Sequence, residues 1–359
     1  MVIVLIPNTV KNILKKIENN GFEAYIVGGF VRDFLLLRNT NDIDIATNAR
    51  PKDLMRIFGI PKNDSLYGSY HMLIKGLNFD ITTYRREGEY ENGKPVNVTY
   101  SNSLLEDAKR RDFTINAMYM NKNEELIDLL DGRKDLKNKV LRMIGNPSVR
   151  LKEDPTRILR AVRFASMYHL KLEKTLKTAI QKEKKNISNI PINKIRKELD
   201  VILLANGFPM LKKLGLLKEL GINNNHLVYV ADLAGLWAQI DTDLDYIKEK
   251  ELKRMIKKIR NIINCGTINV LVLYKNGYYT TRVAASIMHF PIKVLEKMEN
   301  SMIIKTRKDI DISVEEIKEI SDLNKEDLGL LISEVEEKIL LKKLNNDRES
   351  IVKYIEERR

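Results

Sequence analysis

The sequence predicts an α+β N-terminal head followed by an all-α remainder, on three observations. Short apolar runs of the β type alternate with helical segments up to about residue 140. Beyond that point nearly every segment has a helical period. The loops there are marked by glycine or proline, as at Gly207 and Pro209. A chain whose pattern changes once in this way is expected to fold as an α+β part followed by a helical part.

The elements of the head are expected in the order strand, helix, strand, and then further strands. A helix of two turns is predicted over residues 30–37, between the first two strands. The predicted strands cover residues 24–27, 43–46, 71–75, 79–84, 117–120 and 126–130. Each is a short apolar run, bounded by glycine or polar residues.

The composition favours a polyanionic partner. The chain of 359 residues carries 62 Lys and Arg against 49 Asp and Glu, a formal net charge of +13. Cys265 is the only cysteine, so no intramolecular disulfide can form, which agrees with a reducing cytoplasm. The apolar run over residues 2–6 is too short for a signal peptide or a membrane span. We therefore expect a soluble, cytoplasmic protein with no membrane partner.

Residues 25–47, YIVGGFVRDFLLLRNTNDIDIAT, combine features that separately carry little information. Gly28 and Gly29 allow a sharp turn and a close approach of the backbone to a ligand. Asp42 and Asp44 alternate with isoleucines, so both carboxylates point to one face of the predicted strand. Adjacent carboxylates repel each other unless a cation lies between them, and hard oxygen ligands select Mg²⁺. In isolation a glycine pair is usually a turn and an Asp-x-Asp usually a solvated strand edge, but here they occur together.

Two further segments carry charged residues in patterns that suit phosphate chemistry. In KRRDFTINAM, residues 109–118, Arg111 and Asp112 offer a cation for a triphosphate and an acceptor for a sugar hydroxyl. In FDITTYR, Asp80 adds a third carboxylate, to bind a metal ion or to deprotonate an attacking hydroxyl. The ordinary alternatives are a solvated helix start and a surface aspartate on a strand.

The segment EDPTRILRAVRF, residues 153–164, predicts a helix with Asp154 as its N-cap and Pro155 in its first turn. Asp154 and Arg157 are three residues apart and therefore lie together on the helix surface. Taken alone, the pattern is that of a capping acid with an i,i+3 salt bridge.

Together these segments resemble the signature of the DNA polymerase beta-like nucleotidyltransferases. They are most similar to class II tRNA nucleotidyltransferases (CCA-adding enzymes) and their relatives, the bacterial poly(A) polymerases. The similarity covers about residues 20–205 and is most specific in RRDFTINA and ED-x-x-R. One departure is Leu37, which stands where the family usually has glycine. The resemblance implies a nucleotidyltransferase head with a mixed sheet at 1–140, then an all-α neck at 141–210, body at 211–300 and tail at 301–359.

The resemblance also implies roles for individual residues. Asp42, Asp44 and Asp80 are expected to be catalytic, and the first two to hold Mg²⁺. In this family the acid and arginine of ED-x-x-R form an amino-acid template that pairs with the edge of C or A and rejects G and U. The polar stretch 85–95 is similar to the family's flexible loop, needed for adding the terminal A. The expected nucleotide-binding residues are Gly28, Gly29, Arg32, Asp33, Arg111, Asp112, Asn116, Asp154, Arg157, Arg160 and Arg163.

The function implied is addition of the 3′-terminal CCA to tRNA from CTP and ATP, with release of pyrophosphate and without a nucleic-acid template. The neck would bind the incoming base and the tail would bind tRNA. Three alternatives stay open: a poly(A) polymerase, a specialised CC-adding or A-adding enzyme, and a non-catalytic RNA-binding module. The sequence carries no signal for the oligomeric state.

Overall fold

The computed structural model describes residues 5–59, 68–91, 93–242 and 244–358. The predictions for residues 2–6 and 85–95 therefore fall partly outside the described residues. The chain divides into two compact units, Met1–Ile222 and Asn223–Arg359. The finer division into head, neck, body and tail stays a prediction.

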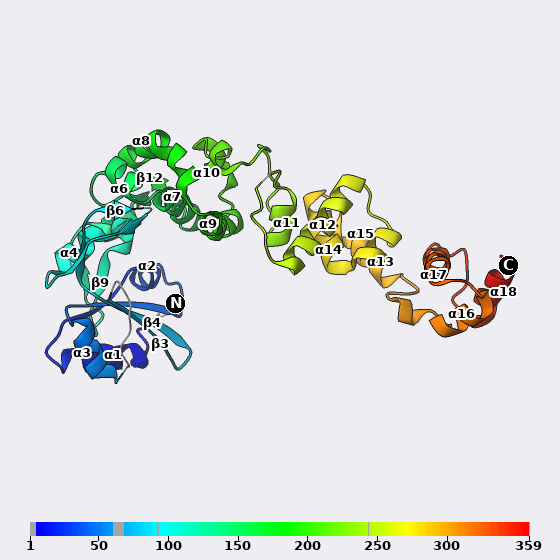
Figure 1. Ribbon diagram of the computed structural model, residues 1–359, viewed down its shortest axis with the longest axis horizontal. Coiled ribbons are helices and arrows are strands. Elements are labelled where there is room, and N and C mark those ends of the chain that lie inside the picture. The colour runs from blue at the N-terminus through cyan, green and yellow to red at the C-terminus, as the bar shows by residue number, and fades with distance from the viewer. Residues whose placement is uncertain (1–4, 60–67, 92, 243, 359) are drawn as a thin grey trace. The chain divides into compact units, whose positions relative to one another are not determined.

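Unit 1 contains a six-stranded mixed sheet with the order β10-β9-β1-β2-β4-β3 (Figure 1). Strands β2 and β4 run parallel, and the other neighbours are antiparallel. All six predicted strands are confirmed, with their ends displaced by at most two residues. Their bounds are β1 (Ala24–Val27), β2 (Asp42–Thr47), β3 (Ser69–Ile74), β4 (Leu77–Thr83), β9 (Met118–Met120) and β10 (Leu126–Asp128).

The α-helices of unit 1 occur before, between and after these strands. Among the described residues they are α1 (Asn8–Glu18), α2 (Gly29–Leu35), α3 (Pro51–Phe58), α4 (Leu104–Arg110), α5 (Gly132–Lys137), α6 (Pro147–Glu153), α7 (Thr156–Met167), α8 (Lys174–Glu183), α9 (Ile192–Leu204) and α10 (Phe208–Lys213). Helix α7 packs against α6 and α9. It is amphipathic and buries Ile158, Val162 and Ala165 of its apolar face.

Helix α2 ends earlier than predicted, at Leu35 rather than at residue 37. Leu37 adopts a left-handed conformation with φ of 56°. The amide of Leu37 donates to Phe34 O at 3.0 Å and that of Arg38 to Asp33 O at 2.8 Å. These two bonds form a Schellman motif, which usually has glycine at the left-handed position. The departure at Leu37 therefore falls where glycine would relieve backbone strain.

Short strands add detail that the pattern did not predict. The stretch expected to be a flexible loop contains β5 (Arg85–Glu87), β6 (Tyr90–Glu91) and β7 (Lys94–Pro95), followed by β8 (Val98–Tyr100). Strand β5 pairs with β8, and β6 pairs with β7. After residue 140, β11 (Val140–Leu141) and β12 (Lys171–Leu172) form a parallel pair, a small exception to the expected all-α remainder.

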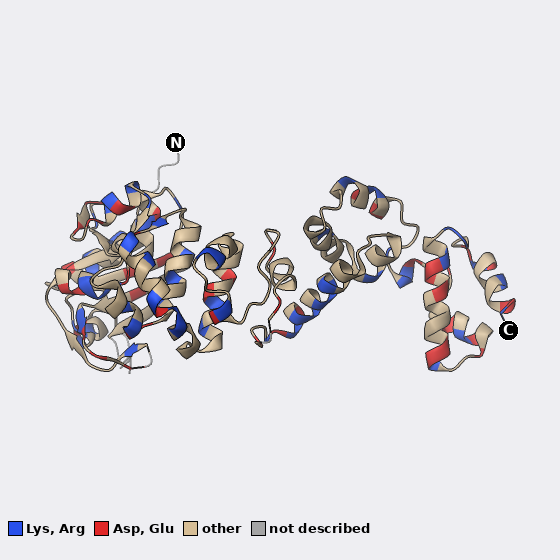
Figure 2. Ribbon diagram, turned by 90° about the horizontal axis from the view of Figure 1, so that it is seen from above, with Lys and Arg blue, Asp and Glu red and all other residues tan. Residues whose placement is uncertain are grey.

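In its described residues unit 2 is helical. Its α-helices are α11 (Leu233–Ala238), α12 (Lys250–Cys265), α13 (Val270–Asn276), α14 (Tyr278–Ile287), α15 (Ile292–Asn300), α16 (Val314–Ser321), α17 (Lys325–Leu340) and α18 (Arg348–Glu356). Figure 2 shows Lys and Arg along α12 and acidic residues along α17. Ile317, Val335 and Ile351 lie at the centre of a buried apolar cluster of the last three helices. Within the described ranges, no helix combines the length and the apolar content needed to cross a bilayer.

Candidate active site

Every residue that the sequence predicts for the site lines one cavity of unit 1. Its volume is about 1130 Å³, larger than the roughly 300–1,000 Å³ of most small-molecule sites. The predicted residues in its lining are Gly28, Gly29, Arg32, Asp33, Asp42, Asp44, Asp80, Arg111, Asp112, Asn116, Asp154, Arg157, Arg160 and Arg163. The fold thus brings together segments that are far apart in the sequence, while the role of each residue stays a prediction.

Three carboxylates come from the adjacent strands β2 and β4. We call Asp42, Asp44 and Asp80 the strand wall of the cavity. In the parallel register of these strands, Asp44 lies opposite Asp80 and Asp42 lies opposite Asn78. Residues opposite each other point to the same face of a sheet. Asn78 Nδ2 donates a hydrogen bond to Asp42 Oδ1 at 3.0 Å.

The charges of the strand wall are poorly compensated. Burial raises the pKa of Asp44, the positive charge of Arg111 lowers it, and the negative charges of Asp80 and Asp42 raise it further, so that it lies above the ordinary value. Burial likewise raises the pKa of Asp80, although His71 and several arginines partly oppose this. Oδ1 of Asp80 is buried and accepts no hydrogen bond. His71 Nδ1 is 3.7 Å from this oxygen and is largely exposed.

These features of Asp44 and Asp80 fit a divalent cation held at the strand wall. A raised pKa and a buried oxygen without a hydrogen bond are expected where a cation supplies the missing positive charge. In the described part of the chain, no three His, Cys, Asp or Glu side chains form a ready-made metal site. Mg²⁺ is commonly bound by one or two protein carboxylates together with substrate phosphates.

Gly28 allows the backbone of the β1–α2 turn to approach the strand wall. Its φ of 74° favours glycine, and a Cβ atom there would lie only 3.0 Å from Asp44 Oδ2. Arg111 Nη1 would be 3.6 Å from the same Cβ position. The turn, the carboxylate and the guanidinium therefore meet at one point of the cavity.

The guanidinium of Arg32 is fixed from several sides. It donates to Asn116 Oδ1 and to Tyr168 Oη, each at 2.6 Å, and to both oxygens of Asp33 at 3.1 Å. Tyr168 Oη in turn donates to Asp33 Oδ1 at 2.8 Å. The Arg32 guanidinium carbon also lies 4.3 Å from the centre of the Tyr168 ring, a cation–π contact. These contacts connect α2 with the residue that follows α7.

A second part of the cavity lining comes from the end of α4 and from α7 with its preceding residues. We call Arg111, Asp112, Asp154, Arg157 and Arg160 the helix wall. Arg160 donates to Asp112 Oδ2 through Nε at 2.8 Å and Nη2 at 2.5 Å. Although burial alone would raise the pKa of Asp112, the charge of Arg160 and hydrogen bonds to the carboxylate lower it to about 2. Asp112 therefore stays ionised at any physiological pH.

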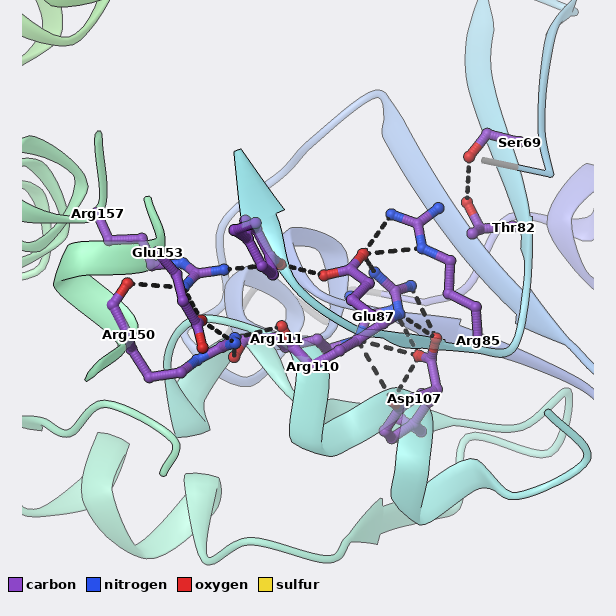
Figure 3. A network of polar contacts seen from close by, with 12 residues as sticks. Ser69, Thr82, Arg85, Glu87, Asp107, Arg110, Arg111, Arg150, Glu153 and Arg157 are labelled. Atoms are coloured by element: carbon purple, nitrogen blue, oxygen red, sulfur yellow. Dashed lines mark hydrogen bonds and ion pairs between the residues drawn. The ribbon is translucent and has the colours of Figure 1, made fainter. Parts of the chain in front are cut away.

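Arg111 is held next to the strand wall by a fully buried carboxylate. Asp107 accepts from Arg110 Nη2 at 2.7 Å, from Arg111 Nη2 at 3.0 Å and from Tyr119 Oη at 2.8 Å. Burial would raise the pKa of Asp107, but the two guanidinium groups keep it below the ordinary value. Glu87 lies 3.5 Å from Arg110 Nη1 and continues this network toward the cavity (Figure 3).

Asp154 and Arg157 do not form the i,i+3 salt bridge of the ordinary interpretation. The N-cap residue of α7 is Pro155, one residue later than the predicted Asp154. Asp154 Oδ1 instead caps the turn that leads into α7 by accepting from Thr156 N at 3.0 Å and Thr156 Oγ1 at 2.6 Å. Arg157 instead donates to Glu153 Oε2 at 3.0 Å (Figure 3). It also donates to Tyr90 Oη at 3.1 Å. Because only one oxygen of Asp154 is used for capping, the other is available to a ligand in the cavity.

Arg163 has its partner on another helix. Its Nε lies 2.7 Å from Glu198 Oε2 of α9, and its guanidinium carbon lies 4.3 Å from the centre of the Phe164 ring. The contact connects the helix that lines the cavity with its neighbour. Arg163 lines the cavity as predicted, and its proposed role in nucleotide binding stays a prediction.

Some cavity residues were not predicted from the sequence. Tyr168 and His71 show no local pattern that distinguishes them from ordinary surface or core residues. Tyr90 offered a weak signal, since it is the aromatic residue of a polar, glycine-punctuated stretch. Its hydroxyl also donates to Glu87, so it joins Glu87 to Arg157.

Comparison with known proteins agrees with this geometry. A family model described as the Poly A polymerase head domain matches residues 24–142. The chain is 30% identical to the CCA-adding enzyme of Ligilactobacillus salivarius over 98% of its own length and 97% of the relative's. Other curated CCA-adding enzymes, at 37% and 44% identity, align over about half of their own length.

Solved structures share the fold over the whole chain. The CCA-adding enzyme of Bacillus stearothermophilus in complex with CTP has a TM-score of 0.82 at 24% identity, covering 99% of this chain and 98% of that one. The Thermotoga maritima enzyme complexed with tRNA has a TM-score of 0.68 at 20% identity, covering 98% and 95%. These structures establish the fold, and the full-length curated relative establishes the kinship. The chain belongs to the family of CCA-adding enzymes.

Proposed function

We propose that this protein adds the 3′-terminal CCA to tRNA, using CTP and ATP and no nucleic-acid template. The observation that carries the proposal is the meeting, in one cavity, of the strand wall and the helix wall. The first suits metal-assisted nucleotidyl transfer and the second suits recognition of a base edge. Relatives solved with CTP and with tRNA are consistent with both substrates. We assign the activity to the cytoplasm, in keeping with the single cysteine.

The strand wall would carry the transfer step. The family generally uses a divalent metal ion, and we assign Mg²⁺ to Asp42 and Asp44. When bound, it supplies positive charge for the transferring phosphoryl group and the departing pyrophosphate. Asp80, with its buried oxygen, would accept the proton of the attacking 3′-hydroxyl. Arg111, which lies beside Asp44, would bind the triphosphate.

The helix wall would select the nucleotide. The second oxygen of Asp154 can accept from the exocyclic amine that C and A share. Arg157 can donate to their ring nitrogen. U and G present a carbonyl oxygen and a ring N–H at these positions, so both protein groups would lose their hydrogen bonds in the cavity. Arg111 and Asp112 would bind the sugar and the phosphates while Asp154 and Arg157 contact the base.

A nucleotide-by-nucleotide assay tests this proposal. Transcripts of tRNA that end before the first C, before the second C and before the A are each incubated with one labelled nucleotide. We expect CTP to be added to the first two and ATP to the third, and neither UTP nor GTP to be added. Long A tails on an unstructured oligonucleotide would identify a poly(A) polymerase. Addition of only CC or only A would identify a specialised enzyme, and no addition would leave an RNA-binding module.

A further inference from the structure

Arg150 of α6 does not line the cavity, yet it contacts both parts of the helix wall. Its side chain is only 13% exposed. Nη2 donates to the backbone oxygens of Arg110 at 2.6 Å and Arg111 at 3.0 Å. Nη1 donates to Glu153 Oε2 at 2.8 Å. One guanidinium therefore joins the end of α4 to the end of α6 (Figure 3).

The two ends of this connection lead to the residues that we propose to bind different parts of the nucleotide. The backbone oxygens belong to residues at the end of α4, directly before Asp112. Helix C-terminal carbonyls carry partial negative charge, so a guanidinium binds there favourably. On the other side, Glu153 Oε2 also accepts from Arg157 Nη1 at 3.0 Å, and this Nη1 donates to the backbone oxygen of Arg150 at 2.8 Å. Arg157 is therefore oriented by both the side chain that Arg150 binds and the backbone of Arg150.

A second arginine shows what an ordinary helix-end contact looks like. Arg260 of α12 donates to the backbone oxygens of Trp237, Ala238 and Ile240 at the end of α11. The distances are 3.4, 3.1 and 3.0 Å. In the described part of the chain, no carboxylate joins Arg260 to another arginine. What distinguishes Arg150 is the shared oxygen of Glu153.

We propose that Arg150 is a positioning residue for nucleotide selection. It fixes Arg157, which contacts the base, relative to Arg111 and Asp112, which bind the sugar and the phosphates. The hydrogen-bonding groups of Arg157 are then correctly placed for the base only when the sugar is bound by Arg111 and Asp112. The proposal rests on the proposed function, because it assumes that Arg157 contacts the base. A displacement of about 1 Å in such a site can cost about 100-fold in rate. Loss of Arg150 should therefore reduce the discrimination between CTP and UTP while the protein still folds.

The test compares Arg150→Met with the matched variant Arg260→Met. Both changes remove a guanidinium from helix-end carbonyls and keep an unbranched side chain. The measurements are kcat/KM for CTP and UTP on tRNA that lacks its CCA end, together with the melting temperature. In Arg150→Met we expect the CTP-to-UTP ratio of kcat/KM to fall about tenfold or more. In Arg260→Met we expect the ratio to stay at the wild-type value, whatever the effect on melting.

Two further variants keep the test decisive. Arg150→Lys keeps the charge, but a single ammonium cannot bind the carbonyls and Glu153 with the same fork, so the ratio should still fall while folding is retained. If Arg150 acts through Glu153, then Arg150→Met combined with Glu153→Gln should lose no more discrimination than Glu153→Gln alone. Additive losses would contradict this route.

The outcomes distinguish a failure of the proposed function from a failure of the role proposed for Arg150. If the wild-type protein adds neither C nor A, the proposed function is wrong, and the role of Arg150 in selection is wrong with it. If the wild type adds both and Arg150→Met melts earlier with an unchanged ratio, Arg150 is an ordinary helix-end contact like Arg260. Only a lowered ratio in the Arg150 variants, absent in Arg260→Met, supports a positioning role.

Discussion

The strand wall and the helix wall line the same cavity but differ in how far their charges are paired. On the strand wall, burial and mutual repulsion raise the pKa of Asp44, and Asp80 keeps a buried oxygen without a hydrogen bond. On the helix wall, Asp112 is paired with Arg160 and Arg157 with Glu153, and the pKa of Asp112 is lowered to about 2. We propose that a bound cation compensates the charge of the strand wall, whereas the paired charges of the helix wall are already ordered for binding a ligand.

The largest effect is expected from a change to the strand wall. Asp44→Asn removes a charge that the cation needs, so incorporation should fall by about 1,000-fold or more, roughly 4 kcal/mol of transition-state stabilisation. Binding of tRNA should be almost unchanged, because the polyanion is not expected to rest on these acids. The measurements are single-turnover incorporation and filter binding.

The matched control is Asp53→Asn, an acid of the same unit that does not line the cavity and caps α3. This control should keep the wild-type incorporation rate. Near wild-type turnover of Asp44→Asn in Mg²⁺ would contradict the assignment of the strand wall.

An effect of intermediate size is expected on the free energy of unfolding, which should depend on pH through Asp112 of the helix wall. The pKa of Asp112 is about 2 in the folded protein and 3.8 ordinarily. Its ionised form therefore stabilises the fold at pH values above 3.8, and this contribution is lost as the pH falls toward 2. The linkage amounts to about 2 kcal/mol. Asp112→Asn should be less stable than the wild type near neutral pH, with a difference that narrows between pH 4 and pH 2.

Urea unfolding followed by circular dichroism measures this difference. Trp237, the only tryptophan, lies in unit 2, so its fluorescence separates the unfolding of that unit from the unfolding of unit 1. A difference between Asp112→Asn and wild type that stays constant from pH 7 to pH 2 would contradict the paired state of the helix wall.

A smaller effect is expected when one contact of the helix wall is removed from the side of β6. Tyr90→Phe deletes the hydroxyl that joins Glu87 to Arg157. The loss should cost about 1 kcal/mol, seen as a several-fold decrease in the CTP-to-UTP ratio of kcat/KM. Tyr279→Phe removes a comparable hydroxyl bond to Asp232 in unit 2 and should leave the ratio unchanged. If Tyr90→Phe has the same CTP-to-UTP ratio of kcat/KM as Tyr279→Phe, Tyr90 does not orient Arg157.

The smallest effect is expected from a residue outside both walls, where a change should alter stability without altering incorporation. Leu37 is 62% exposed and has a φ of 56°, so Leu37→Gly removes strain while adding unfolded-state entropy. We expect unit 1 to gain about 0.5 kcal/mol and incorporation to be unchanged. Leu36→Gly, at the neighbouring residue with φ of −94°, should instead destabilise. Equal destabilisation by both changes would argue against strain at Leu37.

The sequence predicted the strand wall better than the helix wall, for a physical reason. Alternation along β2 places Asp42 and Asp44 on one face, and the two-residue period needs no knowledge of the fold. The contacts of the helix wall join residues far apart in the chain, such as Arg157 with Tyr90, and no local pattern predicts them. The same holds for Tyr168 with Arg32 and for the pairing of β11 with β12.

The central claim is that the helix wall selects the nucleotide while the strand wall transfers it, and Asp154→Ala tests it most directly. The measurement is kcat/KM for CTP, ATP, UTP and GTP on tRNA lacking its end, alongside a melting curve. The account predicts that discrimination against UTP and GTP falls at least tenfold. The free energy of unfolding should fall only by the ~0.5–2 kcal/mol typical of a lost side-chain cap. A variant that melts earlier yet keeps the wild-type nucleotide ratios would contradict the account and leave Asp154 as a simple helix cap.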